Sequence, residues 1–164
     1  DLLIDALAEL IKRDSSYKLL AAGEFYDDEK FYRDKVESLK LNLHVKLLNE
    51  FIPNEEVVKY FEPSDLVVLP YRTATQSGIL NLAYGFLKPV LVTDVGGLAE
   101  FVDNGKTGYV IKPDSQEDLV NGIINFFEQR QKINFKENIK NRISQNAFNN
   151  LPELLQKIIT DTEK

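Results

Sequence analysis

The sequence contains no cysteine, no methionine and no tryptophan, and it has a single histidine, His44. Without cysteine, disulfide bridges and cysteine-ligated zinc sites are excluded. One histidine also disfavours multi-histidine metal centres and Ser-His-Asp hydrolase sites, although a site made only of carboxylates survives these counts. His44 has no obvious partner, so we expect it to be structural or exposed.

Long hydrophobic runs and an excess of positive charge are also missing. No stretch approaches the roughly 18 consecutive apolar residues that a membrane span requires, and no signal peptide opens the chain. The 20 Lys and Arg residues against 26 Asp and Glu residues leave a net charge of −6, which disfavours capture of nucleic acid or anionic membranes. We therefore predict no nucleic-acid partner, no membrane span and a cytoplasmic location, with the full-length protein either free or peripheral at the inner membrane face.

The length and composition fit one globular domain, residues 1–164. A chain of this length can bury a hydrophobic core that is stable without disulfide bridges or other cross-links. An apolar stripe of helical period starts at Leu2 with no initiator methionine, which is typical of a piece of a longer protein. From Tyr17 onward, short apolar runs alternate with helical segments and indicate βα units. The runs at 65–70 and 89–93 are continuously apolar, as strands covered on both faces require. We predict an α/β fold with a Rossmann-like, mostly parallel sheet between helical layers.

The same periodicities predict where the individual elements lie. Strands are expected at 17–22, 44–49, 65–70, 89–93 and 108–111. Helices are expected at 2–13, 28–40, 54–61, 78–86, 97–102, 115–131, 134–147 and 151–162. The acidic run at 27–29 is interpreted as the first turn of a helix and not as a metal site.

Ligands of an open parallel sheet bind beyond the carboxyl ends of its strands, so the loops that follow the strands are candidate sites. The loop 71–78 offers hydroxyls, a carboxamide and a helix start at about Gly78, a combination suited to phosphate. Arg72 adds a planar, charged fork for the same anion. Serine or threonine before a helix is also an ordinary cap, and an arginine after a strand is often only solvated. The sequence lacks the GxxxxGK[ST] and GxGxxG phosphate motifs.

The loop after the next strand places Gly96 and Gly97 at another helix start, where glycines permit positive φ and a close approach of backbone to ligand. Such a pair often only turns the chain. Glu100 is placed either to accept hydrogen bonds from sugar hydroxyls or merely to favour the helix dipole. Phe51 and Ile52 follow the second strand and could form an apolar wall against the flat base of a nucleotide. Burial of both residues in the core is the favoured interpretation.

A succession of short motifs between residues 65 and 119 carries a family likeness. The motifs are Lys88-Pro89-Val90, Asp94-Val95-Gly96-Gly97, Glu100, Asn104-Gly105, Thr107-Gly108 and Pro113-Asp114, after a strand that ends in Leu-Pro and a glycine-containing helix start. They closely resemble the C-terminal, donor-binding lobe of family 4 retaining glycosyltransferases, which have the two-lobed GT-B architecture. Weaker matches at 47–56 and 148–151 extend the likeness to nearly the whole chain.

The resemblance implies a lobe that binds a nucleotide-diphosphate sugar as donor, with no resident cofactor and no metal. It places the diphosphate at Arg72, Thr75, Gln76, Ser77, Gly78 and Ile79, the sugar at Gly96, Gly97 and Glu100, and the base at Phe51 and Ile52. The full-length protein would transfer a hexosyl group with retention of anomeric configuration, and its N-terminal, acceptor-binding lobe would be the missing partner. The resemblance assigns no catalytic residue.

Two departures from the family pattern limit what the resemblance implies. The family's paired glutamates are absent, because two alternative alignments place Thr75 with Ala83, or Ala74 with Leu82, at their positions. The family's first strand and its two basic residues also have no counterpart ahead of Leu2. That strand lies inside the family's sheet, in the strand order 3-2-1-4-5-6. We therefore predict a gap, a reordered sheet or a swapped neighbour, incomplete phosphate binding, and an isolated chain that is inactive.

Three hypotheses for function follow from these observations. The favoured one is the nucleotide-sugar lobe of a retaining glycosyltransferase. The second is a catalytically silent nucleotide-sugar-binding or interaction module of the same fold, which the absent glutamates motivate. The third is a receiver-like signalling domain, which predicts an acidic cluster and a phosphorylatable aspartate at the strand ends, where this chain carries Gly, Thr and Arg instead.

Overall fold

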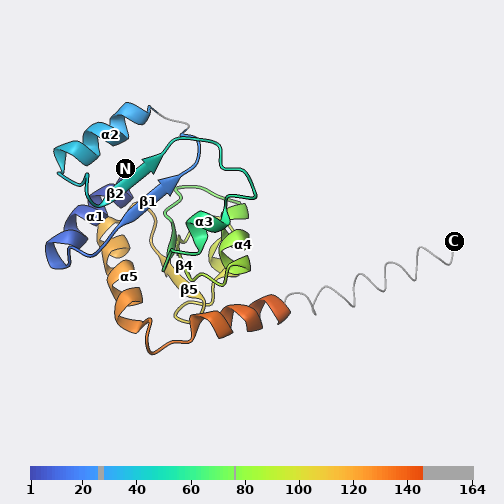
Figure 1. Ribbon diagram of the computed structural model, residues 1–164. Coiled ribbons are helices and arrows are strands. Elements are labelled where there is room, and N and C mark those ends of the chain that lie inside the picture. The colour runs from blue at the N-terminus through green and yellow to red at the C-terminus, as the bar shows by residue number, and fades with distance from the viewer. Residues whose placement is uncertain (26–27, 76, 146–164) are drawn as a thin grey trace, which may run out of the picture.

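A computed structural model describes residues 1–25, 28–75 and 77–145 of the chain. Its strands are β1 (Leu19–Ala22), β2 (Val45–Leu48), β3 (Val67–Leu69), β4 (Val90–Thr93) and β5 (Gly108–Ile111). Its helices are α1 (Leu2–Arg13), α2 (Glu29–Ser38), α3 (Val58–Phe61), α4 (Gly78–Gly85), the 3-10 turn η1 (Ala99–Phe101) and α5 (Gln116–Gln129), and a further helical run covers 135–145 (Figure 1).

The strands form two parallel sheets. β1 pairs with β2, with Leu19 opposite Val45, and β3, β4 and β5 form the second sheet, with Val90 opposite both Val67 and Gly108. Helices flank these sheets, which confirms the predicted Rossmann-like α/β class. Within residues 1–25, 28–75 and 77–145, no strand pairing joins β1 to β3. The resemblance predicts a gap, a reordered sheet or a swapped neighbour, and the described residues show the gap.

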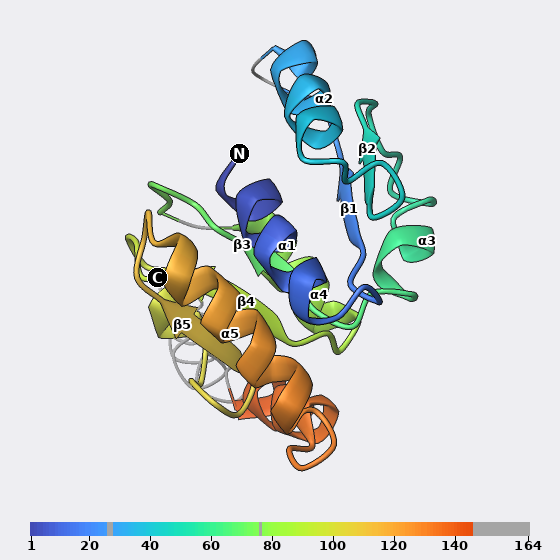
Figure 2. The same ribbon diagram turned by 90° about the vertical axis from the view of Figure 1, so that its left-hand side faces the viewer.

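Helix α1 holds the two sheets together (Figure 2). Its Ala6 and Leu10 belong to one buried cluster with Leu91 of β4, whereas its Ile4 and Leu7 belong to another cluster that packs on β1 and β2. α1 also packs along α5. Because one helix contributes to both cores, the halves form one body although no strand of the described residues bridges them.

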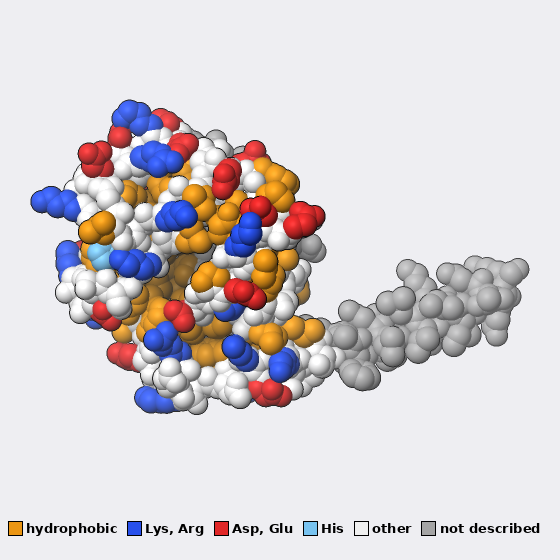
Figure 3. All heavy atoms as spheres, viewed as in Figure 1, with side chains coloured by type: hydrophobic (Ala, Val, Ile, Leu, Met, Phe, Trp, Pro, Cys, Tyr) orange, Lys and Arg blue, Asp and Glu red, His pale blue; other side chains and the backbone are white. Residues whose placement is uncertain are grey.

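The gap between the sheets coincides with a hollow on the surface. Figure 3 shows hydrophobic side chains gathered in a hollow near the middle of the face seen in Figure 1, over the region between β1 and β4. Inner strands of a fully formed parallel sheet have such side chains covered. The hollow is therefore the surface counterpart of the missing strand pairing.

Most of the predicted elements are confirmed to within a few residues, and one helix is substantially shorter. Residues 54–57 form turns, and α3 begins only at Val58. The β-branched pair Val57 and Val58 and the following Pro63 leave room for a single helical turn. The helix predicted at 151–162 lies outside the described residues. No helix in the described ranges is long and apolar enough to cross a membrane.

Candidate functional site

The start of α4 faces the loop that leaves β3. Ser77 is the N-cap of this helix, and its Oγ accepts a hydrogen bond from the Leu80 amide at 3.2 Å. The first main-chain hydrogen bond of the helix runs from Asn81 N to Ser77 O at 3.4 Å. The amides of Gly78 and Ile79 precede this ladder, and they carry the positive end of the helix dipole. The hydroxyl of Ser77 is thus used by the helix itself, whereas these two amides are the donors that the helix leaves for a ligand.

A cavity of about 540 Å³ opens at this helix start. Its lining consists of Tyr71, Thr73, Ala74, Thr75, Ser77, Gly78 and Ile79. Four of the residues predicted to meet a diphosphate are therefore brought together, while Gln76 lies outside the described residues. A Cβ built on Gly78 would meet no atom within 4 Å, so side chains do not plug the approach at that residue.

The Gly96–Gly97 turn lies against the loop that lines this cavity. A Cβ on Gly96 would lie 1.7 Å from Ala74 O, and a Cβ on Gly97 would lie 3.3 Å from Thr75 O. Gly96 also has a φ of +53°, in the left-handed region that favours glycine. The two glycine loops found in the sequence therefore meet. The space beside Gly96 is filled by the protein's own carbonyl group, so packing alone requires glycine there.

Arg72 lies outside the lining of the cavity. Its Nε donates to Asp114 Oδ1 at 3.0 Å, and its Nη2 lies 3.6 Å from Asp1 Oδ2. All three side chains are exposed, and exposed ion pairs contribute little free energy. The guanidinium can therefore exchange these carboxylates for another anion with little loss.

The residues predicted to contact the base and the sugar are mostly exposed. Phe51 is 71% exposed, Ile52 is half-buried and Glu100 is exposed. The favoured interpretation that Phe51 is buried in the core is wrong. Phe51 lies in the loop that leaves β2, and among the described residues β2 has a strand neighbour on one side only. An exposed aromatic ring of this kind is suited to stack on a flat base.

His44 and the acidic run have structural roles. His44 is half-buried, and its Nδ1 donates to Tyr17 O at 3.0 Å. Asp28 caps α2, since its Oδ1 accepts from Lys30 N at 2.9 Å. In the part of the chain that the structure describes, no group of three or more His, Cys, Asp or Glu residues lies together as a metal ion would require.

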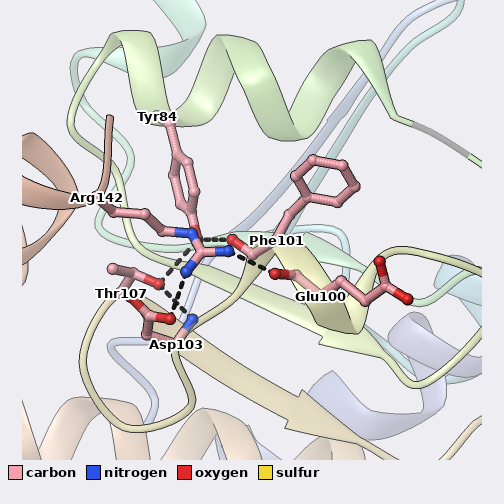
Figure 4. A network of polar contacts seen from close by, with 6 residues as sticks. All are labelled: Tyr84, Glu100, Phe101, Asp103, Thr107 and Arg142. Atoms are coloured by element: carbon pink, nitrogen blue, oxygen red, sulfur yellow. Dashed lines mark hydrogen bonds and ion pairs between the residues drawn. The ribbon is translucent and has the colours of Figure 1, made fainter. Parts of the chain in front are cut away.

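Sequence reasoning missed a polar network around η1, the turn that follows Gly96–Gly97 in the chain (Figure 4). We call it the Arg142 network, and it consists of Tyr84, Glu100, Phe101, Asp103, Thr107 and Arg142. Burial raises the pKa of Tyr84 above the ordinary tyrosine value. Of these six residues the family motifs include Glu100 and Thr107. Arg142 is 39 residues from its partner Asp103, and no local pattern in the sequence connects the two.

A family model and known proteins place this geometry in context. The family model described as "Glycosyl transferases group 1" matches residues 1–149. The chain belongs to the group 1 glycosyltransferases. This membership confirms the predicted glycosyltransferase C-terminal lobe, and it makes the receiver-like hypothesis wrong.

Relatives of this glycosyltransferase chain are longer than the chain itself. An uncharacterized glycosyltransferase from Methanocaldococcus jannaschii is 28% identical over 134 residues, which cover 80% of this chain and 35% of that protein. A D-inositol 3-phosphate glycosyltransferase from Rhodococcus jostii is 30% identical over 123 residues, or 72% of this chain and 27% of that protein. The chain therefore spans about a third of the length of these relatives.

Solved glycosyltransferase structures have the same fold. Anabaena HepE in complex with UDP superimposes with a TM-score of 0.78 and 24% identity over 97% of this chain and 44% of that chain. HepE in complex with UDP-glucose gives a TM-score of 0.73 and 26% identity over 88% of this chain and 40% of that chain. These likenesses confirm the Rossmann-like lobe of the GT-B architecture.

Proposed function

We propose that the chain is the donor lobe of a retaining hexosyltransferase and binds a nucleotide-diphosphate sugar in the cavity at the start of α4. One observation carries the proposal: Gly78 and Ile79, whose amides precede the hydrogen-bond ladder of α4, line this cavity, and the Gly96–Gly97 turn lies against two other lining residues, Ala74 and Thr75. Helix starts bind phosphate through such amides and through the helix dipole. The UDP and UDP-glucose complexes of HepE support this class of ligand.

The proposed donor spans three loops. Its diphosphate lies at the loop 75–79, with Arg72 leaving its exposed carboxylate partners to join it. Its sugar lies toward Gly97 and Glu100, and its base lies on Phe51 and Ile52. As the bond from the sugar to the diphosphate breaks, negative charge grows on the departing oxygen, and fixed amides and the helix dipole stabilise that charge without reorganising.

The proposed binding needs no metal ion, because the helix dipole, the amides and Arg72 supply the positive charge. Addition of EDTA should leave the affinity for UDP unchanged, as measured by titration. The assignment to family 4 and the retaining course of transfer stay predictions from the resemblance, and the cytoplasmic location stays a prediction from the composition.

A silent binding module of the same fold is the second candidate. It is favoured by the cavity lining, which contains no carboxylate among the described residues. The two alignments place Thr75 with Ala83, or Ala74 with Leu82, at the positions of the family's paired glutamates. None of these residues is an acid. Both candidates bind the donor, and only the first turns it over once an acceptor-binding lobe is present. A screen of UDP-, GDP- and ADP-sugars for transfer or hydrolysis by the chain joined to such a lobe separates them.

Gly78→Asp tests the binding site directly. A side chain at residue 78 enters open space, and an acid in the first turn of a helix is favourable, so the variant should fold at least as stably as the parent. Its carboxylate would face the diphosphate and repel it. We expect UDP affinity to fall at least about tenfold in Gly78→Asp, which corresponds to about 1.4 kcal/mol.

The isosteric variant Gly78→Asn is the matched control, because it fills the same space without charge. It should lose less affinity than Gly78→Asp in an NMR titration with UDP. Equal affinity of both variants for UDP would show that the diphosphate does not lie at the start of α4.

A further inference from the structure

The carbonyl groups of η1 are all accounted for, and side chains from distant parts of the chain bind the last two. Within the turn, Phe101 N donates to Leu98 O at 3.1 Å and Val102 N donates to Ala99 O at 3.1 Å. The end of a helix leaves its final carbonyls without such partners. Here Arg142 Nη2 donates to the carbonyl of Glu100, and Tyr84 Oη donates to the carbonyl of Phe101 at 2.9 Å.

Arg142 is held firmly behind this turn. It lies one helical turn beyond Ile139, which is fully buried in the cluster beneath β4. The side chain of Arg142 is only 16% exposed, its Nη1 forms an ion pair with Asp103, and its Nε is buried. A side chain fixed by its backbone, its burial and two acceptors has one position. It therefore transmits the position of the 135–145 helix to η1.

The network also connects η1 to α4. Tyr84 belongs to α4, and its hydroxyl lies 2.8 Å from Thr107 Oγ1, which in turn accepts from Asp103 N at 2.9 Å. Asp103 is the ion-pair partner of Arg142. The helix whose start is proposed for the diphosphate is thereby tied to the turn proposed for the sugar. In Figure 4 the carboxylate of Glu100 points away from this network.

We propose that Arg142 is a positioning residue for the donor sugar: by holding the main chain of Glu100 it fixes the carboxylate of Glu100 relative to the start of α4. This inference rests on the proposed function. Arg142 itself does not touch the donor, and it acts through η1. Its loss should therefore weaken binding of the sugar and leave binding of the diphosphate intact.

The test compares UDP with UDP-glucose on the 164-residue chain, by NMR titration, which also measures weak binding. In Arg142→Gln, we expect the affinity for UDP-glucose to fall about tenfold, because the Glu100 carboxylate would lose a hydrogen bond to the sugar, and a hydrogen bond to a charged group is worth about that much. The affinity for UDP should change less than about twofold. Lys140→Gln is the matched control. It removes the same charge from an exposed position of the same helix, and it should change neither affinity.

A double-mutant cycle identifies the route of the effect. If Arg142 acts through Glu100, Arg142→Gln should have no further effect on the ratio of the two affinities once Glu100 is alanine, because coupled residues are not additive. Amide hydrogen exchange at 98–103 provides a second measurement, and it should become faster in Arg142→Gln and stay unchanged in Lys140→Gln.

Each outcome decides the matter. A parallel fall of both affinities, or an unchanged ratio, overturns the positioning role while the proposed function stands. Additive effects of the Arg142 and Glu100 substitutions also overturn it. If the parent chain binds UDP and UDP-glucose equally, no sugar contact exists for Arg142 to position. If the parent binds neither, the proposed function itself fails, and faster exchange at 98–103 then makes Arg142 a structural clamp only.

Discussion

The strands β1 and β4 have comparably apolar sequences, LLAA and VLVT, and very different surroundings. All four residues of β4 are buried, whereas β1 alternates between half-buried and exposed residues, with Leu20 38% exposed. β4 has a strand on each side, while β1 has one strand neighbour within the described ranges. The burial of a strand in a parallel sheet is thus decided by its neighbours and not by its own composition.

The difference matters for function because the candidate site belongs to both halves unequally. The cavity at α4, the Gly96–Gly97 turn and the Arg142 network all lie on the half with β3, β4 and β5. The other half contributes Phe51 and Ile52, which follow β2. Residues proposed for the diphosphate and sugar therefore rest on a closely packed core, and those proposed for the base rest on the more open half.

The largest effect is expected from truncating one leucine of β4 and comparing it with one leucine of β1. Leu91 of β4 is fully buried, so Leu91→Ala should lower the free energy of unfolding by about 3 kcal/mol through lost burial and the cavity left behind. Leu20→Ala in β1 should cost less than about 1 kcal/mol, because Leu20 already contacts solvent. Urea unfolding of both variants measures the difference. Equal losses would show that the two halves are equally well packed.

A smaller effect is expected at alkaline pH. Burial raises the pKa of Tyr84 and of Tyr17 above the ordinary value of about 10. The folded state therefore keeps these phenols protonated where the unfolded state begins to ionise. The stability they contribute is complete below pH 10 and is lost as the pH rises through the higher folded-state pKa.

The comparison of two variants assigns this alkaline loss to one half. Tyr84 is buried in the second half, and Tyr17 is only half-buried beside β1. Tyr84→Phe should cost about 1 kcal/mol near pH 7 through its lost hydrogen bonds, and it should flatten the alkaline decline more than Tyr17→Phe. Thermal unfolding between pH 7 and pH 11 measures both. A decline that Tyr84→Phe leaves unchanged contradicts the assignment.

The smallest effect concerns single amides along the gap. Leu19 N donates to His44 O at 2.8 Å, and Val67 N donates to Pro89 O at 3.0 Å, so alternate amides of β1 and β3 point into the gap. The amides that point into the gap are those of Leu20, Ala22 and Val68. We expect them to exchange hydrogen faster than the amides next to them, as measured by NMR. Exchange as slow as that of Leu91 would mean that another segment covers these edges.

The sequence predicted element types better than element lengths. Continuous apolar runs at 65–70 and 89–93 identified β3 and β4, because their pattern is local. The helix predicted at 54–61 is only one turn long in the structure. The acidic first turn and the helical periodicity favoured a longer helix, but the low helix propensity of Val57 and Val58 and the helix-breaking Pro63 limit it. The gap in the sheet was predicted from the family resemblance, and it is present in the strand order.

The two loops of the candidate site were also found in the sequence, but their relation to each other was not. Thr75, Ser77, Gly78 and Ile79, which the resemblance assigns to the diphosphate, line one cavity. Nothing in the sequence shows that Ala74 O occupies the space beside Gly96. Arg72 was predicted to face an anion, and the structure pairs it with Asp114, 42 residues away.

By itself, the sequence determined the α/β class, the order of the strands and helices, and the two glycine loops, because hydrophobic period and turn chemistry are written locally along the chain. Only the tertiary structure decided that Phe51 is exposed, that Ala74 O fills the space beside Gly96, and that Arg142 holds η1. Those outcomes depend on contacts between residues tens of positions apart, and such contacts leave no periodicity in the sequence from which they could be read.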